Sequence, residues 1–447
     1  MHLPLPAPDS STLFARLQPA DMAKVVAHIA PTVDGQYLHW DQLRHRQPPD
    51  GLNTEQWWLA LAMGRSPLLQ TLPLLDHSGR TFQFAVPHSI QIDLHHIDRD
   101  AAGHIRAQGD SPLEADRQRY LLNSLIEESI TSSQLEGAST TRKVAADMLR
   151  QGRKPRDHSE RMIFNNYRAM EYIRSLGKQP LTPALILQIQ QMLTEGTLEN
   201  PADEGCWRSS DDVRVVDNRD GTILHQPPPA ADIPARMQRL CDFANADEQA
   251  RPFVHPVLRA MLLHFMIGYD HPFADGNGRT ARALFYWSMA RSGYWLMEFI
   301  SISHILKQAP AQYVKAYLYS ETNNDTTYFL LHQLGTVRKA IAALHDYLAR
   351  KTRDQRDTEK LLHPARLRGE LNHRQLALLT HALKNPGQGY RVDAHQRSHA
   401  IAYQTARADL LWLENLGLLD KAKQGQAFVF YAPDDLPQRI ERLRQST

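Results

Sequence analysis

The sequence predicts a mainly α-helical protein built from several compact parts. Three observations support this fold class. Between about residue 111 and residue 345, apolar side chains recur every three or four residues, which is typical of amphipathic helices. Strand-like runs are short and few. From residue 366 onward the order is helix, turn, helix and hairpin, which predicts a winged helix-turn-helix.

Size and composition limit the class of protein. A chain of 447 residues with 42% hydrophobic residues is long enough for two or three domains. The net charge of +2 does not by itself indicate a nucleic-acid-binding protein. Two cysteines, Cys206 and Cys241, cannot form a disulfide framework and suit a reducing compartment, and no apolar run is long enough to cross a bilayer. We therefore expect a cytoplasmic protein without membrane contact.

Residues 1–110 are expected to form a small mixed α+β module. The runs TFQFAV (81–86) and SIQIDL (89–94) alternate apolar and polar side chains, as half-buried strands do. The sequence indicates no role for this module.

Residues 111–345 are expected to form an all-helical domain with one inserted hairpin. The hairpin is predicted at 213–225, where two β-type runs flank Asp220-Gly221. Helical spacing of apolar residues predicts the helices at 117–137, 160–176, 183–196, 233–245, 255–269 and 278–293.

The carboxyl-terminal part follows a charged, helix-permissive linker at 346–365. The winged helix-turn-helix is expected at 366–447. It would consist of a helix at 371–385, a helix-turn-helix segment at 398–419 and a short hairpin at 420–432.

Contact with DNA is one possible role for this last part. Gln404, Thr405 and Arg407 lie where a recognition helix would begin. Residues 364–447 hold twelve Lys and Arg against eight Asp and Glu. This excess suits DNA contact without requiring it, and a protein contact or a homodimer interface fits the same pattern.

The segment HPFADGNGRTAR, residues 271–282, has the composition of an anion site. Gly276 and Gly278 allow backbone N–H groups to approach an anion closely, and the helix that begins here adds the positive end of its dipole. Arg279 and Arg282 lie three residues apart on one helix face, where two guanidiniums can clamp a polyphosphate.

Two further groups extend this anion site to a reaction. Asp275 is a hard oxygen ligand for Mg²⁺, although such a residue is also a common helix N-cap. His271 can accept a proton near neutral pH, although a lone histidine is more often structural. The set as a whole predicts phosphoryl or nucleotidyl transfer.

The same segment resembles the Fic signature, H-x-F-x-[D/E]-G-N-G-R-x-x-R, at every specified position. The resemblance extends over about residues 115–335, and includes the segments 160–173 and 301–330. It implies protein AMPylation, in which AMP passes from ATP to a Ser, Thr or Tyr hydroxyl of a target protein.

The resemblance also implies a role for each residue of the motif. His271 would be the general base, Asp275 would hold Mg²⁺, and Asn277 with its flanking glycines would hold the α-phosphate region. Arg279 and Arg282 would hold the β and γ phosphates. Doc-type kinases of the same superfamily replace the glycine turn that this chain keeps, so the resemblance favours nucleotidyl over phosphoryl transfer.

The hairpin at 213–225 resembles the Fic flap. An exposed strand edge there would register a target segment by main-chain hydrogen bonds. The candidate docking residues, for which surface packing is an equal explanation, are Val215, Val216, Ile223 and Leu224.

Residues 132–137, SSQLEG, resemble the inhibitory pattern of the family, [S/T]-x-x-x-E-[G/N]. Of the five Glu-Gly or Glu-Asn pairs in the chain, only Glu136-Gly137 has Ser or Thr, here Ser132, four residues before the glutamate. The resemblance implies that Glu136 pairs with Arg282 and takes the guanidinium that the γ-phosphate needs.

Two other functions stay open at this point. In some Fic proteins the inhibitory glutamate aligns a water that removes AMP, which would make this chain a dual transferase and hydrolase. Alternatively, the chain is a DNA-binding regulator whose Fic core senses a nucleotide. The sequence indicates neither the target protein nor the trigger that releases Glu136.

Overall fold

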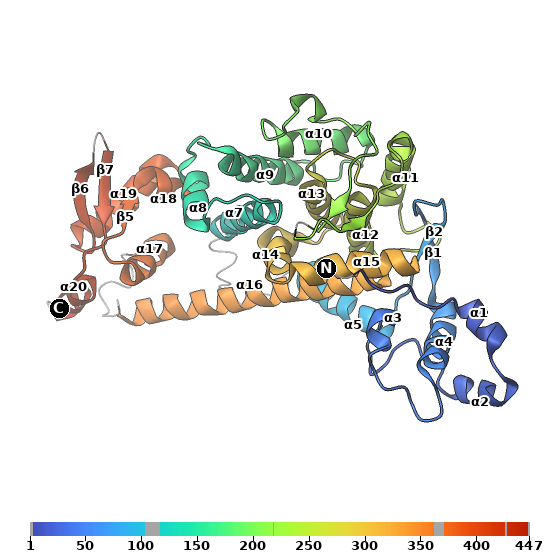
Figure 1. Cartoon of the computed structure of the whole chain (residues 1–447). Helices are drawn as coiled ribbons and strands as arrows, with labels where there is room; N and C mark the ends of the chain where they lie inside the picture. Colours follow the sequence, from blue (N-terminus) through green and yellow to red (C-terminus); the bar gives the residue numbers. More distant parts are fainter. Residues whose placement is uncertain (1–2, 103–116, 218, 362–370, 425–426, 446–447) are drawn as a thin grey trace. The chain divides into compact units, whose positions relative to one another are not determined.

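The structure, a computed structural model, is mainly helical, as expected, with three small sheets among the described residues (Figure 1). None of the helices in these ranges combines the length and the apolar surface that crossing a bilayer would need. The structure describes residues 3–102, 117–217, 219–361, 371–424 and 427–445.

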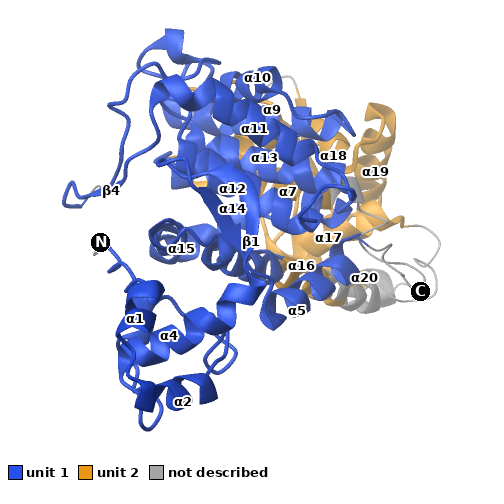
Figure 2. Cartoon of the chain, turned by 90° about the vertical axis from the view of Figure 1, so that its right-hand side faces the viewer, with its two compact units in different colours: residues 1–103, 128–139, 157–340 blue, residues 104–127, 140–156, 341–447 orange. Residues whose placement is uncertain are grey.

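The chain divides into two compact units, each made of segments that are far apart in the sequence (Figure 2). Unit 1 comprises residues 1–103, 128–139 and 157–340. Unit 2 comprises residues 104–127, 140–156 and 341–447.

The amino-terminal part of unit 1 is a small helical cluster with one antiparallel strand pair, β1 and β2. Its core is formed by Val25, Leu43 and Leu59 together with the tryptophans of α4. Short 3₁₀ and π segments follow α4 and α5 at Ser66–Leu68 and Asp98–Ala102. The elements are α1 (Ser10–Arg16), α2 (Pro19–Ala27), α3 (Trp40–Leu43), α4 (Thr54–Arg65), β1 (Gln70–Leu75), β2 (Thr81–Phe84) and α5 (His88–Ile97).

The strand predicted at 89–94 is wrong, because SIQIDL lies within the helix α5. Ile90, Leu94 and Ile97 are buried at helical spacing, whereas Ile92 is 41% exposed. The six residues of SIQIDL fit both the alternating pattern of a strand and the spacing of a helix. Ile97, which follows this run, is buried at helical spacing and decides for the helix. The strand predicted from TFQFAV is present as β2.

Strand β2 connects this amino-terminal part to the rest of unit 1. Gln83 accepts a hydrogen bond from the Thr326 amide at 2.8 Å, and the Ala85 amide donates to Thr327 Oγ1 at 2.8 Å. Residues 1–103 therefore share a compact unit with residues 128–139 and 157–340, whereas the sequence predicts a separate module for residues 1–110.

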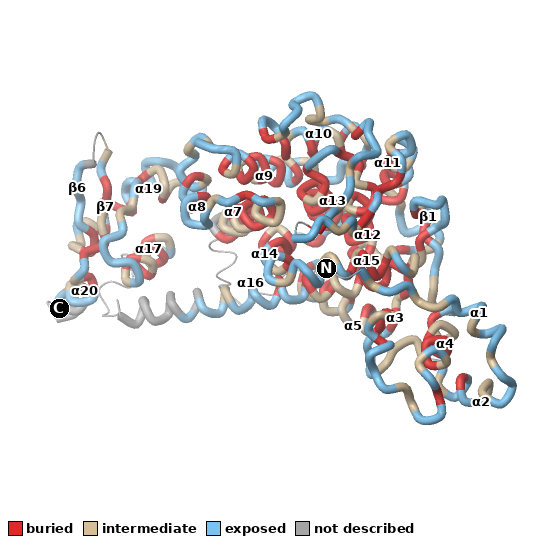
Figure 3. The backbone as a smooth tube through the Cα atoms, viewed as in Figure 1, coloured by how far each residue is buried: buried red, intermediate tan, exposed pale blue. Residues whose placement is uncertain are grey.

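The helical core of unit 1 surrounds α12 and α13, which carry the largest run of buried residues (Figure 3). All six predicted helices are present. Short 3₁₀ turns lie at Pro201–Asp203, Ala230–Asp232 and Trp295–Phe299. The elements that lie wholly in unit 1 are α9 (His158–Ser175), α10 (Pro183–Thr194), β3 (Val215–Val216), β4 (Ile223–His225), α11 (Ile233–Asn245), α12 (Pro256–Asp270), α13 (Asn277–Arg291), α14 (Ile302–Gln308) and α15 (Pro310–Asn323). Two longer helices are shared between the units: α7 (Arg117–Leu135) belongs to unit 1 from residue 128 onward, and α16 (Thr327–Leu361) belongs to it up to residue 340.

Unit 2 has a core of its own, formed around Leu379, Leu410, Leu413 and Phe430. Its three-stranded antiparallel sheet has the order β5-β7-β6. Helix α8 packs against α18 within this unit. The elements are α8 (Arg142–Gln151), α17 (His373–Lys384), β5 (Gly389–Arg391), α18 (Val392–His399), α19 (Tyr403–Asn415), β6 (Asp420–Gln424), β7 (Ala427–Tyr431) and α20 (Leu436–Gln445).

The order of these elements agrees with the predicted helix, turn, helix and hairpin, and the assignment to the winged-helix class stays a prediction. Most of the predicted helix-permissive linker at 346–365 is helical, because α16 continues without a break to Leu361. The rest of that linker lies outside the described residues.

Candidate active site

The loop between α12 and α13 holds the predicted base and the predicted metal ligand. His271 ends α12 with φ at 45°, in the left-handed region, which costs a non-glycine residue roughly 1–2 kcal/mol. Its amide still donates to the Ile267 carbonyl at 3.1 Å. This backbone conformation terminates the helix and directs the chain into the loop.

The ring of His271 has a defined tautomer. Its Nδ1 lies 3.0 Å from the Gly268 carbonyl oxygen, which can only accept, so Nδ1 carries the proton and Nε2 keeps its lone pair. Burial lowers the pKa of His271, so the ring is neutral at pH 7. A larger residue than glycine does not fit at position 268 in this arrangement, because a Cβ there would overlap the Tyr317 hydroxyl.

Asn277 closes the loop from within. Its Oδ1 accepts from the Phe273 amide at 3.0 Å and its Nδ2 donates to the Phe273 carbonyl at 2.9 Å. Phe273 is buried and stacks on Trp207, with the ring centroids 5.1 Å apart. Since the side-chain amide of Asn277 is used in this way, an α-phosphate would be met by backbone N–H groups, which the first turn of a helix leaves without intrahelical acceptors.

The two arginines of the motif have different surroundings. Arg279 is buried and donates to the Leu193 carbonyl at 2.9 Å and to Asp275 Oδ2 at 3.2 Å. It therefore ties the loop to the end of α10. Its predicted contact with phosphates stays a prediction.

Arg282 faces the end of α7. Its Nη2 donates to Glu136 Oε1 at 2.7 Å and to the Ser132 carbonyl at 3.0 Å, and its Nε donates to Ser132 Oγ at 2.9 Å. The structure thus brings together the three residues that the resemblance connected.

Glu136 lies directly over the glycine turn. A Cβ on Gly278 would overlap Glu136 Oε1, so only glycine at 278 allows the carboxylate this close. Burial alone would raise the pKa of Glu136, but the charge of Arg282 outweighs it, with Arg279 and His271 adding, and the pKa is lowered. An ionised carboxylate therefore occupies the amino-terminal end of α13, where the helix favours an anion.

The pattern SSQLEG has a local structural reason at each named position. Ser132 supplies two oxygen atoms to Arg282. Gly137 adopts φ at 95° just beyond α7, and the Ala138 amide donates to the Ser133 carbonyl at 3.0 Å, a common way to end a helix. The helix stops at the point where Glu136 can turn toward Arg282.

Asp275 fits a site for Mg²⁺ that is shared with phosphates. Its Oδ1 accepts from the Gly276 amide at 2.6 Å, and its side chain is 56% exposed. Among the described residues, no group of three His, Cys, Asp or Glu is placed to hold a metal. One exposed carboxylate suits Mg²⁺, which commonly takes one or two carboxylates and completes its shell with phosphate oxygens and water.

The predicted hairpin is present as the antiparallel pair β3 and β4. Val216 and Ile223 are 42% and 44% exposed, so they could meet a target segment. Val215 and Leu224 are only partly exposed.

Two residues that the sequence did not indicate attach the hairpin region to the end of α12. His225 contacts the Tyr269 carbonyl through Nε2 at 2.6 Å and Glu321 through Nδ1. Arg208 donates from Nε to the His271 carbonyl at 2.8 Å and from Nη2 to the Pro228 carbonyl. Both lie more than forty positions from the motif, so no local spacing could have connected them with it.

Comparison with known proteins gives a family for this site. Residues 180–289 match the model of the Fic/DOC family. The chain is 28% identical over 198 residues, 44% of its length, to "Protein adenylyltransferase Fic" of Drosophila virilis, of which it covers 38%. It is 41% identical over 70 residues, 16% of its length, to the protein of that name in Drosophila willistoni, of which it covers 14%. A crystal structure of a Fic family protein from Desulfovibrio desulfuricans G20 aligns with a TM-score of 0.49 at 17% identity, covering 78% of this chain and 98% of the other.

The flap anchor generates a prediction. His225→Ala leaves the Tyr269 carbonyl and Glu321 without their partner, which typically costs about 1–3 kcal/mol. We expect amide hydrogen exchange in residues 215–225 to quicken roughly ten- to a hundred-fold. The control is Gln226→Ala, which changes the adjacent exposed residue. Equal exchange in both variants would show that His225 does not anchor the flap.

Proposed function

Because residues 180–289 form a Fic/DOC family domain, we propose that this chain transfers AMP from ATP to a Ser, Thr or Tyr hydroxyl of a target protein. One observation carries the proposal. The unprotonated Nε2 of His271 and the first turn of α13 belong to one loop, which Asn277 closes. A base and a phosphate-binding helix end are thereby held together.

The proposed reaction uses few groups. His271 Nε2 takes the proton of the target hydroxyl, whose oxygen bonds to the α-phosphorus of ATP. The bond from that phosphorus to the bridging oxygen breaks, and pyrophosphate leaves. Asp275 would hold Mg²⁺, which neutralises charge on the phosphates. The N–H groups of α13 stabilise the attacked phosphate.

The flap would present the target to this site. The exposed side chains of Val216 and Ile223 and the main chain beside them offer an edge for an extended segment. Its position relative to the base depends on His225 and Arg208, because these residues bind the backbone at the end of α12, at the carbonyls of Tyr269 and His271.

Glu136 would hold the enzyme inactive in two ways. It engages Arg282, the guanidinium proposed to receive the γ-phosphate. Its carboxylate also lies over Gly278, where it repels a phosphate that approaches the helix end. Releasing Glu136 would leave Arg282 bound to Ser132, so the guanidinium would keep its orientation for a phosphate.

This arrangement predicts that Glu136→Gly activates AMP transfer. A charge-assisted pair is worth roughly 1.5–3 kcal/mol, so the competent population should rise about ten- to a hundred-fold. Arg282→Ala should be inactive with or without Glu136. The measurement is incorporation of labelled AMP into the protein itself and into lysate proteins, with each variant at the same concentration.

The matched control is Glu199→Gly, which removes an exposed glutamate that stands before Asn200, as Glu136 stands before Gly137. It should transfer AMP at the wild-type rate. If Glu136→Gly were no more active than Glu199→Gly, the contact with Arg282 would not be inhibitory. Loss of labelled AMP from a modified target on adding wild type would instead support removal of AMP.

The pKa of His271 predicts the pH dependence of transfer. The base works only when unprotonated, and burial lowers its pKa below the usual 6.5, so activity should fall only below pH 6.5. The charge of Glu136 raises that pKa, so its removal in Glu136→Gly should move the acid limb lower still. The rate of Glu136→Gly between pH 5 and 8 tests this, with His271→Ala as the inactive reference that still binds ATP. An acid limb at or above pH 6.5 would contradict the assignment.

A second candidate function, contact with DNA, is supported by the exposed face of α19. Gln404, Thr405 and Arg407 are exposed at the start of this helix, and Lys421 and Lys423 are exposed on β6. Helix starts and basic strand residues of this kind contact phosphates and base edges in DNA-binding proteins.

Arg407→Ala tests this candidate. We expect the full chain to bind duplex DNA with an affinity that falls as the salt concentration rises. If Arg407 contacts a phosphate, the plot of log affinity against log salt concentration should be less steep for Arg407→Ala, by about 0.9 in slope. Lys178→Ala, which removes an exposed cation of unit 1, should leave the slope unchanged. Fluorescence anisotropy at several salt concentrations measures both. Absence of binding by the wild type at low salt would remove this candidate.

A further inference from the structure

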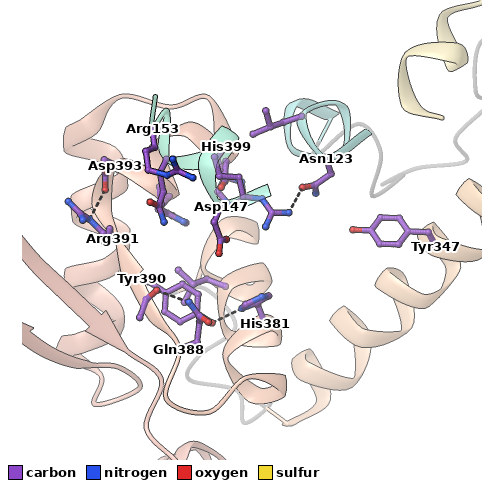
Figure 4. Close-up of a pocket in the computed structure, with 18 residues that line it drawn as sticks. Asn123, Asp147, Arg153, Tyr347, His381, Gln388, Tyr390, Arg391, Asp393 and His399 are labelled. Atoms are coloured by element: carbon purple, nitrogen blue, oxygen red, sulfur yellow. Dashed lines mark hydrogen bonds and ion pairs between the residues drawn. The ribbon is translucent and has the colours of Figure 1, made fainter. Parts of the chain in front are cut away.

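Unit 2 contains a cavity of about 530 Å³ that the proposed reaction does not use (Figure 4). All residues that line it belong to this unit. They come from α7, α8, α16, α17, β5 and α18 and the short connections beside them. In Figure 4, Tyr347 extends from α16 toward the side chains of the other elements.

Cationic groups outnumber anionic groups in its wall. Three arginines and three histidines line the cavity, against two aspartates. One of the aspartates, Asp393, already lies 3.3 Å from guanidinium nitrogens of Arg391 and Arg397. The arginines are Arg150, Arg153 and Arg391, and the histidines are His381, His395 and His399. Burial lowers the pKa of His395 to about 4, so the positive charge of the wall comes from the arginines.

Hydrogen bonds between lining residues fix several of these groups in place. Arg150 donates to Asn123 Oδ1 at 3.1 Å, which joins α8 to α7. His381 Nδ1 lies 2.7 Å from the Tyr390 hydroxyl, which joins α17 to β5. A site whose charged groups are already oriented loses less entropy when it binds an anion.

Aromatic and apolar side chains complete the wall. Tyr347 and Tyr390 provide ring faces, and Leu122 and Leu378 provide apolar surface. Guanidiniums beside aromatic rings suit a ligand that carries a phosphate and a flat ring. The volume falls within the range of about 300–1,000 Å³ that is typical of small-molecule sites.

We propose that this cavity binds a small phosphorylated molecule of the nucleoside monophosphate class, and that its occupancy changes how Glu136 pairs with Arg282. The second part rests on the proposed function. The cavity takes Asn123 from the segment before residues 128–139 and Asp147 and Arg150 from the segment after them. The segment that holds Glu136, residues 128–139, therefore has residues of the cavity wall on both sides of it in the sequence. A ligand that favours one arrangement of α7 and α8 would act on both ends of this segment.

Calorimetry on the full chain tests the binding site, with GMP as the probe and inorganic phosphate as the minimal ligand. Arg150→Glu should weaken GMP binding at least ten-fold, because it reverses a charge in the wall. Arg150→Gln, which keeps a donor for Asn123, should weaken it several-fold while leaving the helix intact. Lys143→Glu is the matched control, because it changes an exposed residue of the same helix that does not line the cavity. Equal affinity in all four proteins would overturn the site, as would loss of binding in Arg282→Ala alone, which would place the probe in unit 1.

Hydrogen exchange of residues 128–139 tests the link to Glu136 without relying on activity. Saturating GMP should change the exchange rate of these residues at least three-fold in the wild type and leave it unchanged in Arg150→Glu. It should also change the rate of AMP transfer by the wild type and leave that of Glu136→Gly unchanged. Binding without any change in 128–139 would overturn the link and leave the site. Failure of the proposed function would appear differently, as an absence of transfer by Glu136→Gly with GMP binding intact.

Discussion

The geometry of this site depends on the two hydrogen bonds between the side-chain amide of Asn277 and the backbone of Phe273. They close the loop that joins the two most buried helices, and the buried Phe273 ring stacked on Trp207 holds the loop to the core. His271, Asp275 and the first turn of α13 all take their positions from this closed loop. Because both amide groups are satisfied inside the protein, the loop needs no ligand to keep its shape.

Around this loop, long-range polar contacts decide what can approach it. Arg279 fixes it to α10, Arg208 and His225 fix it to the flap, and Arg282 fixes it to α7. Arg279, Arg208 and Arg282 each donate to a backbone carbonyl, so removing any of these guanidiniums leaves a carbonyl without its partner. Glu136 is the exception, since Arg282 keeps its two bonds to Ser132 when the carboxylate leaves. Of these contacts, the one with Glu136 is the one that the proposed function requires to open.

The sequence could predict the parts of this structure that are encoded locally. The six core helices follow from apolar spacing, the hairpin from Asp220-Gly221, and the motif from twelve adjacent residues. Arg208 and His225 could not be predicted, because their importance comes from backbone carbonyls that only the fold brings near them. SIQIDL was assigned as a strand because its six residues fit two periods, and burial of Ile97 decides for the helix. The sequence also could not predict that residues 104–127 and 140–156 form one compact unit with residues 341–447, because only tertiary contacts define this unit.

In the proposed function, ATP and the Glu136 carboxylate both approach the amino-terminal end of α13 over Gly278. The hydrogen in place of a methyl group leaves the helix end open, and the Glu136 carboxylate fills that opening. If a phosphate binds at this helix end as proposed, a side chain at 278 that excluded the carboxylate would crowd the phosphate as well, and selectivity between the two anions would have to arise elsewhere. It has to come from the surroundings of α7, on which the position of Glu136 depends. In the proposed function, whatever controls the enzyme therefore acts on α7 and leaves the motif itself unchanged.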